Sequence, residues 1–450
     1  MMFNKNTIKD VLSLALPAVG EMTLYMMIWV FDTMMVGKYG GRVAVSAVGL
    51  SSEILYTFIN IFISVGISVG ITSLVSRRFG AKQYDSAEEY ASVGFFIGII
   101  ISLFISIIMF VFSKHILTLA QAKDDVINLG VTYMRIISFG LFFNMLTSMF
   151  NGIVRGYGNT KTPLLISALI NVVNLSLDWI LIFGRFGFPE LGVKGAAIAT
   201  STAQITGFIF AIIYMLRKSK IKIRIKYIKS LNKNKLKQLL KLAIPSSMQE
   251  GAFSISRLLN TFMIMHIGAT AFAANQITTT IESVSFMPGW GFGVAATTLV
   301  GHKIGEKNYK KAKEYAFTCT FLGALFMALC ALFFLVCPEF LIKLFITNTE
   351  KEVIRIGILC LMVASVEQIP MGISLILGGA LKGSGDTKTP FKVSFVSSWL
   401  IRLPLMFYFI YVLKVSVVYV WWVTAIQWIF EGVTMFILFK RKFKHIKESI

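Results

Sequence analysis

The chain has 450 residues and a formal net charge of +22, with 56% hydrophobic and only 15% charged residues. Soluble domains average about 45–50% apolar and about 25% charged residues, so this composition excludes an ordinary water-soluble protein. Stretches without any ionisable side chain, such as residues 91–113, exceed the roughly 20 apolar residues that a helix needs to cross a bilayer. The sequence therefore predicts an all-α polytopic membrane protein.

Twelve transmembrane helices are expected, six in each half of the chain. In the first half they cover residues 14–37, 46–75, 91–113, 129–154, 163–184 and 195–216. In the second half they cover residues 243–267, 275–300, 316–337, 355–381, 390–413 and 416–439. An even number of spans places both termini on one side of the membrane. Lysine and arginine residues follow spans two, four, eight and ten, which marks that side as cytoplasmic by the positive-inside rule.

Three segments recur in the second half at nearly one offset, which indicates an internal duplication. The loop RGYGNTKTP (155–163) returns as KGSGDTKTP (382–390), and RRFGAKQYDSAEEYA (77–91) returns as HKIGEKNYKKAKEYA (302–316). The segment that begins at residue 15 aligns with the one that begins at residue 243. Because each copy holds an even number of spans, both copies have the same orientation, as in transporters built from parallel repeats.

The duplication predicts an N-terminal six-helix lobe (1–216), a basic cytoplasmic linker (217–241) and a C-terminal six-helix lobe (242–450). The repeated loop is expected to be a structural turn. Its glycines permit a tight turn, Thr160 or Thr387 could cap the next helix, and Pro163 or Pro390 would lie at the start of that helix.

The positive charge does not predict nucleic-acid binding, because the basic residues cluster beside apolar segments. Such clusters are typical of cytoplasmic loops that contact anionic lipid headgroups. The four cysteines lie in or beside apolar segments without metal-binding spacing, and the four histidines are scattered. No phosphate-binding loop or catalytic motif is present in the sequence. We therefore expect neither an enzyme nor a protein that needs a cofactor, and we expect a monomer.

Several motifs together resemble the multidrug and toxic compound extrusion (MATE) family, prokaryotic branch. They are FDTMMVG (31–37), LDWILIFG (177–184), GVKGAAIAT (192–200) and SVSFMPGWGFGVAATTLVG (283–301), together with the repeated loop. The resemblance covers essentially the whole chain. It implies a plasma-membrane antiporter that exports varied, often cationic, small molecules in exchange for inward H⁺ or Na⁺. It also implies two lobes in a V-shaped arrangement around a central cavity.

Ionisable side chains inside membrane spans are costly, so each is a candidate functional residue. Asn171, Asn174 and Asp178 share one face of span five, and such a polar stripe must face protein or water. Carboxylate, amide and hydroxyl oxygens can bind Na⁺, and desolvated carboxylates can instead carry a proton. The resemblance implies a cation site in the N-terminal lobe made of Asp32, Asn174, Asp178 and Thr200. A structural hydrogen-bond network between helices is the alternative.

The second lobe offers Glu250, Glu282 and Asn260 as a possible substrate or polar site. In the repeat Asp32 aligns with Asn260, and Asp178 aligns with Leu405, so coupling is expected in the N-terminal lobe. Some family members use carboxylates in spans seven and ten. Here Glu250 lies close to the start of span seven, and Glu367 lies well before GGALKG, which argues against that second type of cation site. Glu250 could contact a cationic substrate, pair with Arg257 or stabilise its helix start.

Two other functions remain open from the sequence. A flippase or exporter of lipid-linked saccharides, from the same broad superfamily, would want cationic residues in its cavity to hold pyrophosphate. The best-placed spans here carry mainly acids. A membrane enzyme or receptor would need a nucleophile, a metal cluster or a soluble domain, and the linker at 217–241 is too short to form such a domain.

Overall fold

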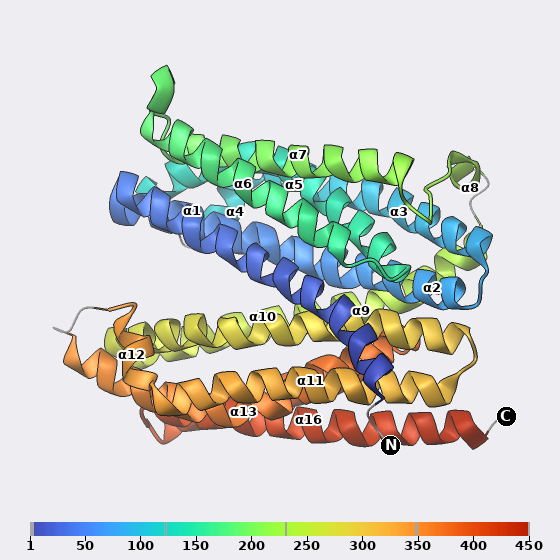
Figure 1. Ribbon diagram of the computed structural model, residues 1–450. Coiled ribbons are helices and arrows are strands. Elements are labelled where there is room, and N and C mark those ends of the chain that lie inside the picture. The colour runs from blue at the N-terminus through green and yellow to red at the C-terminus, as the bar shows by residue number, and fades with distance from the viewer. Residues whose placement is uncertain (1–3, 121, 123, 230–231, 347–349, 449–450) are drawn as a thin grey trace. The chain divides into compact units, whose positions relative to one another are not determined.

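The computed structural model describes residues 4–120, 122, 124–229, 232–346 and 350–448, and all regular structure in these ranges is helical (Figure 1). In the first half the helices are α1 (Lys5–Ile59), the π-helix η1 (Asn60–Ile67), α2 (Ser68–Gly80), α3 (Tyr84–Val111), α4 (Ser113–Leu119), α5 (Asp124–Gly156), α6 (Lys161–Phe183), the 3₁₀-helix η2 (Arg185–Gly187), α7 (Val193–Arg217) and α8 (Ile225–Lys229). In the second half they are α9 (Lys233–Ile267), α10 (Ala269–Gly305), α11 (Tyr309–Val336), α12 (Pro338–Lys343), α13 (Lys351–Gly383), α14 (Lys388–Phe395), the π-helix η3 (Val396–Arg402), α15 (Leu403–Phe407), the π-helix η4 (Tyr408–Val412) and α16 (Val417–Glu448).

Each of the twelve expected spans corresponds to helical structure. α1 contains the first span and much of the second, and the two are separated by a kink at Gly41. Its φ of 58° is a conformation that residues with a side chain rarely adopt. Within the described residues, ten helical segments are long and apolar enough to cross a membrane. The seventh and eighth spans, α9 and α10, are not among these ten because they carry more polar residues, among them Glu250 and Glu282.

The chain forms two compact units. One comprises Thr23–Ser247, and the other comprises Met1–Met22 together with Met248–Ile450. The first helix of each repeat, α1 or α9, therefore passes from one unit to the other. A proline lies shortly before each passage, Pro17 in α1 and Pro245 in α9. The functional division into lobes 1–216 and 242–450 with a linker at 217–241 stays a prediction.

Equivalent contacts hold the start of each of these two helices. In the unit Thr23–Ser247, the Tyr90 hydroxyl donates to Gln238 Oε1 at 2.5 Å. In the other unit, the Tyr315 hydroxyl donates to Asp10 Oδ2 at the same distance of 2.5 Å. The preceding glutamate adds a second contact in each case: Glu89 pairs with Lys235, and Glu314 accepts from Thr7. The repeated sequence EYA thus holds the first helix of the opposite repeat.

Within each unit, two helices cross closely at small residues. Thr72 Oγ1 of α2 donates to the carbonyl of Gly152 in α5 at 2.9 Å. Thr297 Oγ1 of α10 donates to the carbonyl of Gly379 in α13 at 2.9 Å. Small residues allow such close backbone approach, which in membranes replaces the hydrophobic driving force available in water. The two repeats therefore share the hydrogen bond at this helix crossing as well as their sequence motifs.

The repeated loop is a structural turn, as predicted, but its capping residue differs from the prediction. Gly158 and Gly385 both adopt φ of 90°. Neither Thr160 nor Thr387 makes a side-chain cap hydrogen bond. Instead Asn159 Oδ1 accepts from the Thr162 amide at 3.1 Å, and Asp386 Oδ1 accepts from the Thr389 amide at 3.0 Å. An Asn or Asp side chain three residues before the Thr162 or Thr389 amide reaches the free amides of the first helical turn more directly than the Thr160 or Thr387 hydroxyl does.

Asp386 also accepts from Lys442 Nζ of α16 at 2.7 Å. Burial would raise the pKa of Asp386, but the Lys442 ammonium and the Thr389 amide and hydroxyl hold it below the usual 3.8. A lowered folded-state pKa stabilises the protein above the unfolded-state pKa, and that stability disappears as the pH falls through the folded-state value.

We therefore expect wild type to melt at a higher temperature than Asp386→Asn above about pH 4, and the gap to narrow as the pH falls below that value. Thermal melting of detergent-purified protein from pH 3 to pH 8 measures this difference. Exposed Asp125→Asn is the control and should track wild type throughout. A gap between wild type and Asp386→Asn that stays constant from pH 8 down to pH 3 would contradict the ion-pair explanation.

Candidate cation site and the second buried acidic cluster

Three helices of the unit Thr23–Ser247 bring the four predicted site residues together. Asp32 comes from α1, Asn174 and Asp178 from α6, and Thr200 from α7. Asn174 and Asp178 are fully buried, and Asp32 and Thr200 are only 7% and 5% exposed. Asn174 Nδ2 donates to Thr200 Oγ1 at 3.2 Å, and Thr200 Oγ1 lies 3.4 Å from Asp32 Oδ2. The carboxyl groups of Asp32 and Asp178 interact with each other.

Local sequence explains why these side chains meet. Asn174 and Asp178 are one helical turn apart, so both project from the same face of α6. Gly195 lets α7 approach that helix closely, because a Cβ at this position would lie 2.6 Å from the carbonyl oxygen of Leu181. Thr200 follows about one turn and a half after Gly195, and its hydroxyl also donates to the Ala196 carbonyl at 2.9 Å. This second bond fixes the direction of its oxygen lone pairs.

Four oxygens of this cluster are buried without a hydrogen-bond donor in the described part of the chain. They are Asp32 Oδ1, Asn174 Oδ1 and both carboxylate oxygens of Asp178. Two adjacent buried carboxylates cannot both stay ionised without a counter-charge. A proton between them or a hard cation among the four oxygens would supply it, and oxygen ligands of this kind suit an alkali cation. The residues therefore fit either a proton or an alkali cation.

The same described residues contain no group of three or more His, Cys, Asp or Glu side chains that could hold a metal ion. The candidate site has only two carboxylates, and its other ligands are an amide and a hydroxyl. A site with so few charges suits a monovalent ion better than a tightly held divalent one.

Tyrosines surround Asp32, and sequence reasoning missed them. Tyr56 of α1 and Tyr133 of α5 both interact electrostatically with Asp32. Tyr133 is 2% exposed, and its hydroxyl lies 3.0 Å from Ser52 Oγ. The sequence signal that could have found them was a tyrosine hydroxyl in the middle of a span. Tyrosine is common in membrane helices, however, and no sequence spacing links these residues to Asp32.

The other unit contains a second buried acidic cluster, centred on Glu431 of α16, which is 4% exposed. Its Oε1 accepts from Ser374 Oγ of α13 at 2.9 Å and from Ser394 Oγ of α14 at 2.8 Å. Its Oε2 accepts from Ser397 Oγ of η3 at 2.5 Å and from Gln427 Nε2 at 3.2 Å. Four donors satisfy both carboxylate oxygens. Glu431 therefore ties three segments together in the way expected of a structural carboxylate.

Glu282 and Glu367 form a different arrangement in the same unit. Glu367 of α13 is fully buried, and neither of its carboxylate oxygens has a hydrogen-bond partner within the described ranges. Both acids interact electrostatically with Arg402 of η3 and with each other. Gln368 Nε2 donates to Glu282 Oε1 at 3.4 Å. Of the predicted second-lobe residues, Glu282 thus belongs to a charged group whose other members lie far away in sequence.

Glu250 and Asn260 do not join Glu282. Glu250 interacts with Lys382 of α13, with Arg257 and with Ser254. Asn260 is 2% exposed, and neither of its polar side-chain atoms has a hydrogen-bond partner in the described structure. Glu250 thus interacts electrostatically with Lys382 as well as with Arg257, and which of its three suggested roles it has stays a prediction. Glu250, Glu282 and Asn260 therefore lie in three separate environments and do not form one site.

Comparison with known proteins identifies the same duplication. A family model described as MatE matches the chain twice, at residues 17–180 and 245–408. A probable multidrug resistance protein NorM of Thermotoga maritima is 28% identical over 413 residues, which cover 92% of this chain and 88% of that protein. The uncharacterized transporter YisQ of Bacillus subtilis is 28% identical over 397 residues, which cover 88% of this chain and 86% of that protein.

Solved structures share the fold across nearly the whole chain. An outward-facing multidrug resistance MATE transporter of the MOP superfamily superposes with a TM-score of 0.91 at 21% identity, covering 98% of this chain and 97% of that one. A MOP superfamily transporter from Pyrococcus furiosus, for which reversed binding-pocket polarity suggests a different function, gives a TM-score of 0.90 with 21% identity and the same coverage. Two family matches, full-length relatives and this fold agree, and the chain belongs to the MATE family of multi-pass membrane transporters.

Proposed function

We propose that this protein is a secondary active antiporter that exports chemically varied, often cationic, drugs or toxic metabolites in exchange for inward H⁺ or Na⁺. Asp32, Asn174, Asp178 and Thr200 would form its coupling site. The observation that carries the proposal is the set of four buried oxygens of Asp32, Asn174 and Asp178, on α1 and α6, that have no hydrogen-bond donor in the described part of the chain. Relatives described as multidrug resistance proteins support the substrate class.

The geometry gives the residues distinct tasks. Asp32 and Asp178 would hold the ion or proton, because their carboxyl groups interact in a site that excludes water. Asn174 and Thr200 would supply neutral oxygen ligands, and the hydrogen bond from Asn174 would hold the Thr200 hydroxyl beside the Asp32 carboxyl. Ion binding can drive alternating access only if the inward-open and outward-open states bind the ion with different affinity. A site shared by three helices can provide that difference, since small helix shifts change all its distances.

The proposal includes a location and an orientation. Lysine and arginine residues in the expected loops favour a plasma-membrane protein with both termini in the cytoplasm. Its partners would be small-molecule substrates, the coupling ion and membrane lipids, and one chain would work alone. Efflux of toxic compounds by such a transporter would confer drug resistance on the cell.

Purified protein in liposomes loaded with a fluorescent cationic dye tests the function. We expect an imposed Na⁺ gradient or an imposed pH gradient, applied separately, to drive dye movement, and the effective gradient names the coupling ion. Empty liposomes give the leak rate. If neither gradient moves the dye, the antiporter proposal fails, and movement of a fluorescent lipid-linked saccharide in the same vesicles would favour a flippase.

A further inference from the structure

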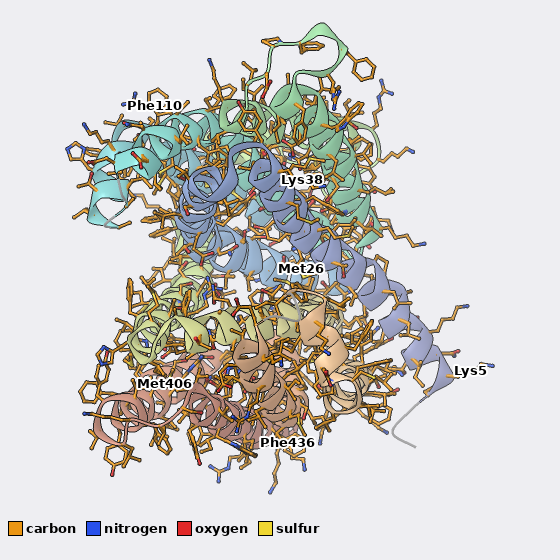
Figure 2. The ribbon with its side chains drawn as sticks, turned by 90° about the vertical axis from the view of Figure 1, so that its left-hand side faces the viewer. Lys5, Met26, Lys38, Phe110, Met406 and Phe436 are labelled. Atoms are coloured by element: carbon orange, nitrogen blue, oxygen red, sulfur yellow. The ribbon has the colours of Figure 1, made fainter. Side chains whose placement is uncertain are left out.

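An arginine lies on the apolar outer face of the unit Thr23–Ser247. Arg135 is exposed on α5, and the described residues around it, such as Phe139 and Phe110, are 62% and 52% exposed. Phe110 marks the margin of its unit in Figure 2. A cluster of large apolar side chains exposed on membrane-spanning helices is the kind of surface that suits contact with lipid. Arg135 therefore places a permanent positive charge at a lipid-facing position, which is costly unless an anion compensates it.

The depth of Arg135 follows from helix geometry. The 33 residues of α5 extend about 50 Å, which exceeds the roughly 30 Å hydrocarbon core by about 20 Å. When this excess length is divided equally between the two ends of α5, each boundary of the hydrocarbon core lies about 10 Å from a helix end. Arg135 follows Asp124 by about 17 Å along the axis, so its Cα lies about 7 Å inside the core. An extended arginine side chain spans that distance and can reach the headgroup phosphates.

Nothing in the described protein neutralises this charge. No carboxylate there forms an ion pair with Arg135, and its one recorded contact is a cation–π interaction with Phe110, whose ring centroid lies 5.9 Å from Arg135 Cζ. Within the described residues no hydrogen bond from the Arg135 guanidinium to a protein acceptor is present, so its N–H donors are open to an anionic ligand.

A cavity of about 340 Å³ adjoins this guanidinium between α3, α5 and α7. Phe139, Ile198 and Ile205 form most of its apolar wall, and Arg135 lies on its lining. An apolar hollow with one cation at its edge matches the chemistry of a phospholipid, which joins a hydrocarbon chain to an anionic phosphodiester. Cationic substrates do not fit this arrangement, because Arg135 would repel them.

We propose that this cavity binds an anionic phospholipid of the adjacent leaflet, with the phosphodiester held by Arg135 and an acyl chain lying along Phe139 and Ile198. The site shares helices α5 and α7 with Tyr133 and Thr200, but none of its lining residues is a proposed cation ligand, and the proposal does not depend on the coupling mechanism. It requires only that α3, α5 and α7 span the membrane.

Native mass spectrometry of the detergent-purified, full-length protein tests the proposal. Phosphatidylglycerol, phosphatidylcholine and inorganic phosphate are titrated separately. We expect wild type to retain phosphatidylglycerol more strongly than phosphatidylcholine, and Arg135→Gln to bind phosphatidylglycerol about fivefold more weakly, since one basic residue near a lipid surface contributes about that much. Arg135→Lys keeps the charge and should retain most of the preference.

Arg185→Gln is the matched control, because Arg185 is also exposed and also lies over an aromatic ring, that of Trp179, at 5.9 Å. It should bind phosphatidylglycerol like wild type. Equal retention of both lipids by wild type, or unchanged binding by Arg135→Gln, would overturn the proposal. An equal loss of phosphatidylglycerol binding in Arg185→Gln would mean that surface charge in general, and not the Arg135 site, causes the effect. Displacement of phosphatidylglycerol by inorganic phosphate would mean that the site binds free anions and is not a lipid site.

Discussion

Replacing Asp178 with asparagine is expected to abolish ion-driven transport while leaving the fold intact. Asparagine has nearly the same shape, but it cannot be ionised and cannot exchange a proton. The loss of a charged ligand costs a bound ion about 3 kcal/mol, equivalent to roughly a hundredfold weaker binding. Asp32→Asn should have a similar effect, because Asp32 interacts with the same carboxyl group. Dye movement in liposomes under the effective gradient measures both variants.

The thermal stability of the same variants separates a coupling site from a structural network. If Asp178 serves ion binding, its carboxylate oxygens have no hydrogen-bond donors to lose. Removing the buried charge should then leave the melting temperature unchanged or raise it. If Asp178 instead holds helices together, Asp178→Asn should lower the melting temperature. Glu431→Gln is the contrasting variant, because Glu431 has four hydrogen-bond donors, and it should melt lower than wild type.

Exposed Asp125→Asn serves as the transport control, since it removes one negative charge outside the buried cluster. Its transport rate should equal that of wild type. Full ion-driven transport by both Asp32→Asn and Asp178→Asn would contradict the proposed coupling site. The arrangement of Glu282, Glu367 and Arg402 would then be the next candidate, because Glu367 is the other fully buried acid of the described chain without a hydrogen-bond partner.

The sequence predicts the helices and their duplication because both depend on short-range patterns. Apolar runs of about 20 residues reveal spans, and the repeated loop reveals the offset. The polar face of α6 could be predicted for the same reason, since Asn174 and Asp178 are one turn apart. Bringing Asp32 and Thr200 to that face required the family resemblance, because nothing in their local sequence indicates which helices pack together.

Contacts between distant segments could not be predicted. Ser374, Ser394 and Ser397 look like ordinary small residues of apolar helices, and only the packing of α16 shows that they all donate to Glu431. Similarly, the repeat made Tyr90 and Tyr315 equivalent. Their partners, Gln238 and Asp10, lie in the first helix of the opposite repeat. Sequence alignment identifies equivalent residues but not the surface each one contacts.

Two neighbouring glycines of α13 should respond to alanine in opposite directions. A Cβ at Gly379 would lie 2.3 Å from the backbone oxygen of Gly293, whereas a Cβ at Gly378 would meet its nearest atom, Met435 Cε, at 3.8 Å. Backbone cannot move aside as a side chain can, so Gly379→Ala should cost about 3 kcal/mol of stability through overpacking. Gly378→Ala should gain up to about 1 kcal/mol, because alanine favours the helix.

Melting curves of the two variants in one detergent measure the difference, and wild type should fall between them. The crossing of α2 with α5 provides an internal repetition of the test, because a Cβ at Gly152 would lie 2.8 Å from the carbonyl oxygen of Ser68. Gly152→Ala should therefore also destabilise the protein. Equal melting temperatures for Gly378→Ala and Gly379→Ala would mean that α10 and α13 can separate at little cost. The small residues at this crossing would then not be needed for close packing of the two helices.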